Sequence, residues 1–286
     1  MDLYLVPKFG KRDIASISRR DIVLFSRELM ITGGVNSDGL APKTINAILS
    51  VLKCIFKYVQ RENGVIIAEI SDVYVKQEQK PIRILSYAEQ QRLTRVLYSE
   101  LSPCYLGILI CLYMGLRLGE ICALKWEDIC IPEQYICVRH TMQRVQIPDD
   151  ENKKTKVVIQ PPKSSCAYRK IPIPNVLYEY LNAAQKTGEA FVLTGLIDKY
   201  LEPRNLENRL KSVATECDIR GITFHTLRHT FATRCVELGF DIKSLSEILG
   251  HSTVNITMNR YVHPSMELKQ RNMNMISDIL SSGINF

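Results

Sequence analysis

The chain has 286 residues, of which 46% are hydrophobic and 23% charged, and it carries a formal net charge of +7. This composition is typical of globular domains and excludes collagen-like, low-complexity and wholly disordered chains. The longest uncharged stretch, which contains Cys104 to Leu116, falls short of the roughly 20 residues of a membrane helix, so we expect a buried core helix. The positive charge suits a polyanionic partner, but equally basic proteins without a nucleic-acid role are common.

The first eighty residues are predicted to be helical. Apolar residues recur at roughly helical spacing from Ile14 to Met30, with an interruption at Ser18, which can cap a second helix with Asp21 in its first turn. After a glycine-rich loop, Pro42 to Arg61 has the clearest amphipathic pattern of the chain. The polar stretch from Lys76 to Pro81 is a candidate linker. We therefore place a domain boundary near residue 80.

The second domain is predicted to be mainly helical with a small sheet. Ser86 and Glu89 form a capping-box pattern for a helix over about 87–100, followed by helices over 103–115 and from about 119. Between about 134 and 174, three runs are rich in β-branched residues, and the first two flank a polar turn at 149–152. A small antiparallel sheet is the simplest interpretation of these runs: Tyr135–Val138, Lys156–Ile159 and Arg169–Ile173. Helices are expected again from residue 175.

The nine cysteines predict a reducing compartment. Their number is odd, none forms a C-x-x-C pair, and several lie in apolar runs. We therefore expect free thiols, no disulfide scaffold and no metal site. The N-terminus lacks the pattern of a signal peptide, so the expected location is the cytoplasm.

Two polar clusters interrupt the segments around the predicted sheet. Arg117 follows a long apolar helix and lies between two glycines, and Glu120 is placed to hold its guanidinium group. A surface arginine at a helix end is the ordinary alternative. Lys163 lies in a Pro-Lys-Ser-Ser segment between two predicted strands, where a solvated lysine is equally ordinary.

Two further clusters lie near the C-terminus. His225, Arg228 and His229 occupy positions i, i+3 and i+4 and so share one face of a helix. The H-x-x-x-H spacing suggests zinc, but the glutamate of metalloprotease helices is missing, and three cationic or donor groups favour an anion such as phosphate. Leu249-Gly250-His251 is followed ten residues later by Tyr261, a residue type that most often belongs to a core or an interface.

Together, the four clusters indicate phosphoryl transfer without a metal. They supply two arginines, a lysine, histidines and a tyrosine, but no carboxylate pair for divalent metals and no nucleotide-binding motif. In such a reaction the arginines neutralise phosphate charge, the lysine protonates the leaving oxygen and the tyrosine is the nucleophile. No cofactor is expected.

The motifs resemble those of the tyrosine recombinases, or phage-type integrases, and most of all the integrases of conjugative transposons. G-L-R-L-G-E, P-K-S-S-C-A-Y-R-K-I-P-I-P, H-T-L-R-H-T-F-A-T and L-G-H followed by R-Y-V-H occur in family order and spacing over nearly the whole chain. The resemblance implies that Arg117 and Arg228 clamp the phosphate and that Lys163 is the general acid. It further implies that Tyr261 is the nucleophile and that His225 assists it. His251 is then expected to bind the phosphate and Glu120 to support the site. It gives no role to His229 or His263.

The resemblance also implies an architecture and a reaction. We expect a helical, SAM-like core-binding domain over 1–80 with its first helix truncated, and a mixed α+β catalytic domain over 81–286 with a tail from 265. The expected reaction is site-specific recombination of a mobile element through a 3′-phosphotyrosine. The implied partners are double-stranded DNA with att-type core sites, a homotetramer on that DNA and an excisionase, with no membrane. A type IB topoisomerase and a catalytically idle DNA-binding regulator are the alternatives.

Overall fold

The computed structural model describes residues 2–34, 36–64, 67–77, 81–100, 102–147, 155–162, 165–186 and 188–262, together with five positions between 266 and 274. Contacts divide the chain into two compact units, Met1–Pro81 and Ile82–Phe286. Each unit has its own apolar core. Within the described residues, no helix is long and apolar enough to cross a membrane.

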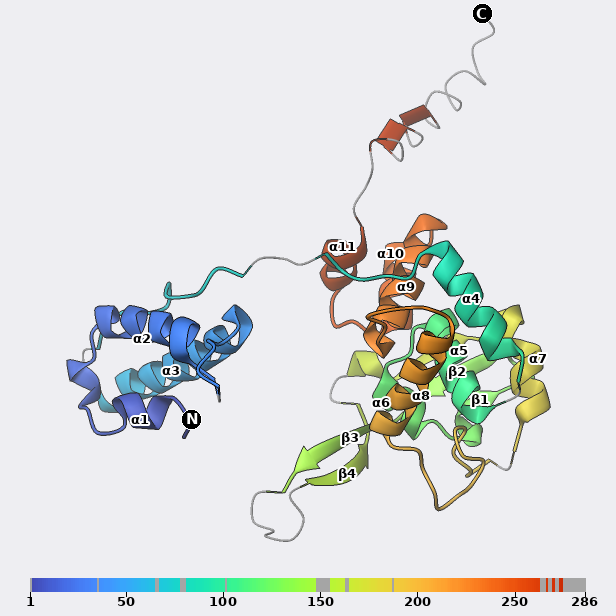
Figure 1. The fold of residues 1–286 in the computed structure, drawn as a ribbon, viewed down its shortest axis with the longest axis horizontal. Helices are drawn as coiled ribbons and strands as arrows, with labels where there is room; N and C mark the ends of the chain where they lie inside the picture. Colours follow the sequence, from blue (N-terminus) through green and yellow to red (C-terminus); the bar gives the residue numbers. More distant parts are fainter. Residues whose placement is uncertain are drawn as a thin grey trace, which may run out of the picture. The chain divides into compact units, whose positions relative to one another are not determined.

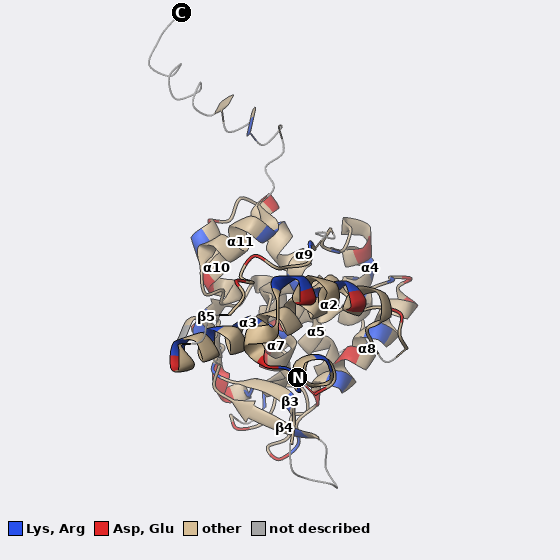
Figure 2. Ribbon diagram, turned by 90° about the vertical axis from the view of Figure 1, so that its left-hand side faces the viewer, with Lys and Arg blue, Asp and Glu red and all other residues tan. Residues whose placement is uncertain are grey.

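The first unit is helical, as the sequence predicts. It consists of α1 (Leu5–Phe9), a 3₁₀ turn, α2 (Arg19–Thr32) and α3 (Pro42–Asn63). The predicted cap is confirmed, since Ser18 and Asp21 form a capping box at the start of α2. Helix α2 carries both basic and acidic residues (Figure 2): Arg19, Arg20 and Asp21 in its first turn, and Arg27 and Glu28 further along. The apolar faces of the helices enclose the core of this unit: Leu5, Phe9, Ile17, Ile22, Phe25, Leu29, Ile45, Leu49, Leu52, Phe56, Ile70 and Val73.

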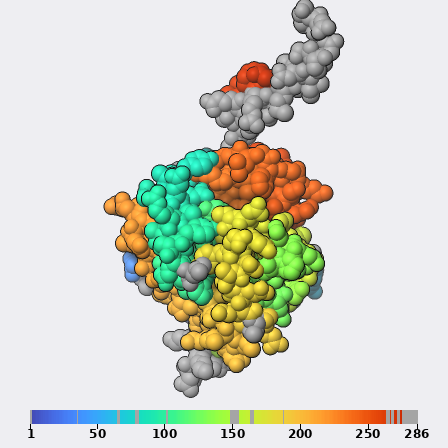
Figure 3. Space-filling view, turned by 90° about the vertical axis from the view of Figure 1, so that its right-hand side faces the viewer, coloured from blue at the N-terminus to red at the C-terminus, as the bar shows by residue number. Residues whose placement is uncertain are grey.

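The second unit is built around one buried helix. Helix α5 (Pro103–Met114) is apolar on all sides, so it is buried on all sides, as predicted for this stretch. Its neighbours are α4 (Tyr87–Tyr98), α6 (Leu118–Ala123), α7 (Asn175–Ala184), α8 (Pro203–Glu216) and α9 (Phe224–Glu237). On the surface, α4 lies beside α7 (Figure 3), and the hydroxyl of Tyr98 donates to the carbonyl of Val176 at 2.6 Å.

Two short helices follow α9 in the second unit. Helices α10 (Ile242–Leu249) and α11 (Val254–Tyr261) pack against each other and against α9 (Figure 1). They enclose a small apolar cluster that is separate from the main core and includes Ala232, Cys235, Leu245, Leu249 and Tyr261. This arrangement brings the end of α11 next to α9.

The strand pairing differs from the expected single sheet. Strands β1 (Ile129–Cys130), β2 (Tyr135–Val138) and β5 (Arg169–Pro172) form one antiparallel sheet, and β3 (Thr141–Gln146) and β4 (Thr155–Gln160) form a second, two-stranded one. The expectation that Lys156–Ile159 belongs to the same sheet as the other two runs is therefore wrong. The partner of β4 is β3, a half-polar strand that the apolar pattern does not reveal. The ribbon of β3 and β4 extends away from the rest of its unit (Figure 1). The turn expected at 149–152 lies outside the described residues.

The expected fold class, mainly α with a small antiparallel β component, is confirmed. In the C-terminal tail, Met266 and Met273 are exposed. Two further apolar residues of the tail, Ile276 and Leu280, lie outside the described residues.

Candidate active site

Three of the predicted side chains, those of Arg117, His251 and Tyr261, lie at or next to helix ends. Arg117 precedes α6 and follows Gly115, which ends α5 in the left-handed conformation at φ 68°. Gly250 ends α10 in the same conformation, and His251 follows it. A Cβ atom at Gly250 would lie 2.9 Å from the guanidinium group of Arg169, so glycine suits this position in both conformation and space. Tyr261 is the last residue of α11.

Arg228 is buried and is held by the backbone. Its guanidinium group donates to the carbonyl oxygens of Gly115 and Leu249, each at 2.5 Å, and lies 3.2 Å from Nε2 of His251. Both carbonyls belong to helix C-termini, where the helix dipole favours a cation. Burial lowers the pKa of Arg228 to about 10, so the group is still charged at neutral pH.

A buried carboxylate joins two further arginines. Glu120 accepts from Arg117 at 2.8 Å, and its two oxygens accept from Arg169 at 3.1 and 2.9 Å. Burial by itself raises the pKa of Glu120, but the hydrogen bonds and charge of Arg169, together with the charge of Arg117, outweigh it, and the net shift is downward. Arg117 also donates to the carbonyl of Gly250 at 2.9 Å. The expected supporting contact of Glu120 with Arg117 is therefore present in the structure.

The orientation of His251 follows from its two hydrogen bonds. Nδ1 lies 2.8 Å from Oγ1 of Thr257, and Nε2 lies next to Arg228, which can only donate. The ring is therefore neutral, with its hydrogen on Nδ1. Partial burial and the charge of Arg228 lower the pKa of His251 to about 4, which agrees with this state.

Tyr261 is buried beside two histidines. Its hydroxyl lies 2.7 Å from Nδ1 of His229, and its ring is parallel to that of His251 with the centroids 6.4 Å apart. Burial raises the pKa of Tyr261, and the charge of Arg228 only partly offsets this effect. The phenol is therefore protonated at neutral pH.

His225 lies one turn before His229 on α9 and is more exposed. The two imidazole centroids are 6.3 Å apart. Partial burial and Arg228 lower the pKa of His225, so this ring is also predominantly neutral at pH 7. Lys163 and His263 lie outside the described residues.

Two residues of the cluster were given no role by the sequence. Arg169 belongs to β5, where inward and outward residues alternate, and its position in phase with Ile171 is the one available signal of burial. Besides holding Glu120, it donates to the carbonyl of Ile248 at 2.6 Å and so links β5 to α10. His229 shares a helix face with His225 and Arg228, but its contact with Tyr261 joins residues 32 apart in the chain.

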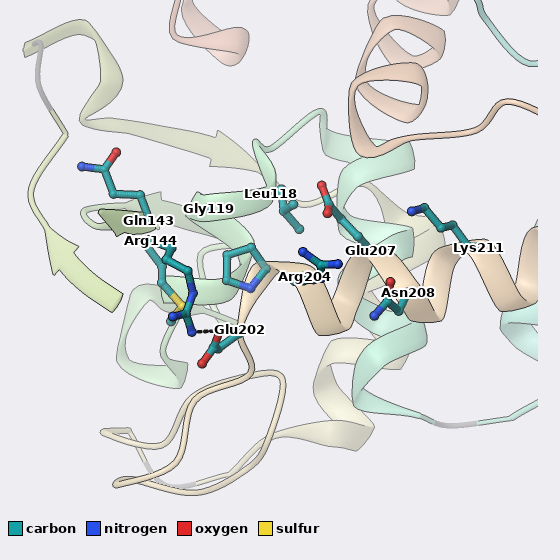
Figure 4. Close-up of a pocket in the computed structure, with 11 residues that line it drawn as sticks. Leu118, Gly119, Gln143, Arg144, Glu202, Arg204, Glu207, Asn208 and Lys211 are labelled. Carbon is teal, nitrogen blue, oxygen red and sulfur yellow. Dashed lines mark hydrogen bonds and ion pairs between the residues drawn. The ribbon is translucent and has the colours of Figure 1, made fainter. Parts of the chain in front are cut away.

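The second unit has two cavities of similar size, and one of them borders the cluster. One, of about 570 Å³, lies between β5 and α10 and includes Arg169, Lys170 and His251 in its wall. The other, of about 580 Å³, lies between β3, the start of α6 and α8 (Figure 4). Both basic and acidic side chains line this cavity, and among them Arg144 forms an ion pair with Glu202 at 2.5 Å. None of the predicted site residues lines this second cavity.

The family of the chain follows from comparison with known proteins. Residues 77–267 match the model of the Phage integrase family. The chain belongs to this family. It is 27% identical over 271 residues to a XerC-like tyrosine recombinase of Caldanaerobacter subterraneus subsp. tengcongensis, covering 84% of this chain and 67% of the relative. It is 24% identical over 300 aligned residues to the transposase of transposon Tn916 from Enterococcus faecalis, covering 97% and 71%.

Solved structures share the fold of this chain. The integrase of transposon Tn1549, in complex with transposon right-end DNA, aligns with a TM-score of 0.76 at 21% identity, covering 94% of this chain and 89% of the integrase. A lambda integrase dimer bound to a core site aligns with a TM-score of 0.63 at 14% identity, covering 92% and 86%. The predicted class is thus confirmed: the chain is a tyrosine recombinase related to the integrases of conjugative transposons, an enzyme of site-specific DNA recombination.

Proposed function

We propose that this integrase cleaves and rejoins double-stranded DNA of a mobile element with Tyr261 as nucleophile. The observation that carries the proposal is the meeting of Arg117, Arg228, His251 and Tyr261 around the ends of four helices. The Tn1549 integrase and the lambda integrase were both solved on DNA, which supports the same partner here. Recognition by a homotetramer, and control by an excisionase, belong to the proposal.

The reaction exchanges one phosphodiester for another. The Tyr261 oxygen attacks the scissile phosphorus as its proton passes to a neighbouring neutral imidazole, the bond from phosphorus to the 5′ oxygen breaks, and a 3′-phosphotyrosine forms. Lys163 gives its proton to the departing 5′ oxygen, which leaves as a hydroxyl group. Because the bond to tyrosine replaces the bond to DNA, rejoining needs no nucleotide cofactor.

The arginines stabilise the charge that develops during attack. Arg117 and Arg228 face the nonbridging oxygens, and their bonds to Gly250, Gly115 and Leu249 hold them before DNA arrives. Such fixed donors lower the barrier because they need little rearrangement when charge develops. Glu120 keeps Arg117 in place, His251 contacts the phosphate next to Arg228, and His225 assists the nucleophile.

The two units have different tasks in this proposal. The helical unit, residues 1–80, binds the core sequence, and the unit from residue 81 carries out the chemistry. Over residues 1–80 there are 12 Lys and Arg against 9 Asp and Glu. This small excess implies that particular side chains matter more than bulk charge for the contact with phosphates.

The test is covalent capture on a nicked duplex. Duplexes are made from the DNA on either side of the coding sequence. A nick is placed a few nucleotides 3′ of the scissile phosphate, so that the short fragment carrying the 5′-hydroxyl diffuses away after cleavage. Wild-type protein should form an adduct that survives denaturation and maps by mass spectrometry to the Tyr261 peptide. Tyr261→Phe should bind the same duplex and form none. An adduct with the Phe variant would refute the assignment, and monomeric supercoil relaxation would favour the topoisomerase alternative.

A further inference from the structure

His229 is the residue that contacts the reactive oxygen of Tyr261. Nδ1 lies 2.7 Å from the phenol oxygen, within the usual range of a side-chain hydrogen bond. The rings lie 5.6 Å apart and are tilted by 53°. His229 belongs to α9, and Tyr261 ends α11, so this bond ties two helices together.

The direction of this hydrogen bond follows from the surroundings. Partial burial and the cations Arg260 and Arg228, with His225 nearby, keep the imidazole of His229 neutral at pH 7, while Tyr261 keeps its proton. A neutral phenol beside a neutral imidazole donates its hydrogen to the unprotonated ring nitrogen. Nδ1 is therefore the acceptor.

The other histidines are less suited to this contact. Both nitrogens of His251 are already engaged, by Thr257 and Arg228, and its ring lies parallel to that of Tyr261. His225 lies one helical turn farther from the C-terminal end of α9 and makes no hydrogen bond within the described residues. In that part of the chain, the hydroxyl of Tyr261 has His229 as its one polar partner.

We propose that His229 is the positioning residue of the nucleophile. Its Nδ1 accepts the hydrogen bond of the phenol and so fixes where the Tyr261 oxygen lies and where its lone pairs point. The proposal rests on the proposed role of Tyr261. A phenol has one hydrogen, and once His229 holds it, the lone pairs face away from the imidazole. Attack on phosphorus needs a lone pair in line with the leaving oxygen, and misplacement by about 1 Å can cost about 10²-fold in rate.

Three substitutions separate the hydrogen bond from packing. In His229→Asn, Oδ1 occupies about the place of Nδ1 and keeps the acceptor. In His229→Gln, the acceptor moves to about the place of Nε2. In His229→Leu, the apolar bulk is kept and the acceptor is lost. Single-turnover adduct formation on the nicked duplex should be near wild type for Asn and lower by about 10²-fold for Gln and Leu.

The reverse order would overturn the proposal. If packing is the role of His229, Leu is tolerated and Asn is the damaging change; if Leu and wild type react equally fast, the residue does not position the nucleophile. Failure of the proposed function looks different, because wild type would then give no adduct or Tyr261→Phe would give one.

A measurement without DNA tests the same bond. The melting temperature is determined for wild type, His229→Leu, Tyr261→Phe and the double variant. If the hydrogen bond exists, His229→Leu lowers the melting temperature in the wild-type background by more than in the Tyr261→Phe background. Equal decreases in both backgrounds would contradict the proposal even if the Leu variant is too unstable for the adduct assay.

Discussion

The arginines of the site and its tyrosine lie in surroundings of different kinds. We call Arg117, Glu120, Arg169 and Arg228 the arginine side, and His229, His251 and Tyr261 the tyrosine side. On the arginine side, every guanidinium group has at least one backbone carbonyl as acceptor, and two of the groups share a buried carboxylate. On the tyrosine side, the reactive oxygen has one neutral hydrogen bond, and the ring rests on a small apolar cluster.

This difference divides the tasks of the two sides. The arginine side is fixed by several charge-assisted bonds, so in the proposed reaction its arginines are already in place when DNA arrives. A single neutral hydrogen bond contributes only about 1 kcal/mol to stability, so the tyrosine side is less firmly held than the arginine side.

The largest effect is expected for Lys163. This residue tests protonation of the leaving oxygen, a step that neither the arginine side nor the tyrosine side performs. Lys163→Ala should slow adduct formation by about 10²–10⁴-fold, the range typical of a general acid. Sulfur in place of the 5′ bridging oxygen should rescue this variant, because a thiolate leaves without a proton. Arg228→Ala serves as the control and should gain far less, since it lacks charge stabilisation of the nonbridging oxygens. Equal rescue of both variants, or of neither, would place the general acid elsewhere.

The next effect tests the rigidity of the arginine side. Glu120→Ala leaves the buried Arg169 without its carboxylate and should lower the free energy of unfolding by about 3–5 kcal/mol. Glu202→Ala removes a half-exposed partner of Arg144 and should cost about 1 kcal/mol or less. Urea unfolding of both variants measures the contrast. Similar losses would mean that burial does not distinguish these ion pairs.

A smaller effect is expected for the tyrosine side. Tyr261→Phe removes one hydrogen bond but keeps the ring on Leu245 and Leu249, so the free energy of unfolding should fall by only about 1 kcal/mol. The same urea titration measures it. A loss as large as that of Glu120→Ala would remove the contrast between the two sides.

The smallest effect concerns pH. The folded pKa values of His229 and His251 are about 4, against an ordinary value of 6.5. Between these values the unfolded chain binds protons that the folded chain does not, so stability should fall as pH falls from 6.5 towards 4. Because both rings are partly exposed, we expect about 1 kcal/mol or less for each. His229→Asn should therefore reduce the fall in melting temperature between pH 7 and 5 by about 2–4 °C, and an unchanged fall would contradict the shifted pKa.

Local sequence patterns predicted much of this structure. Ser18 with Asp21, and Ser86 with Glu89, gave the starts of α2 and α4 because a capping box involves residues only three apart. The uninterrupted apolar stretch predicted α5 as a buried helix, because a helix that is buried on all sides must be apolar on all sides. Arg117, Glu120 and Arg228 were predicted as site residues and share one cluster.

The remaining features depend on distant partners. The pairing of β2 with β5 joins residues more than thirty apart, and β3 carries polar residues that hide it. Arg169 lies in a short strand where a charged side chain is expected to be exposed, and Glu120, 49 residues away, makes its burial possible. The sequence shows His229 only as a neighbour of the motif residues, because its contact with Tyr261 depends on where α11 lies in the fold.

The carbonyl oxygens that hold Arg228 have a consequence for how this site can change in evolution. Gly115 and Leu249 offer main-chain atoms, which every amino acid provides, so replacing side chains there does not by itself remove the acceptors. Changes of length act differently. One residue inserted into α10 would turn its last carbonyl by about 100° around the helix axis and advance it by about 1.5 Å. Insertions and deletions within α10 should therefore be far rarer among functional descendants of this chain than substitutions at the same positions.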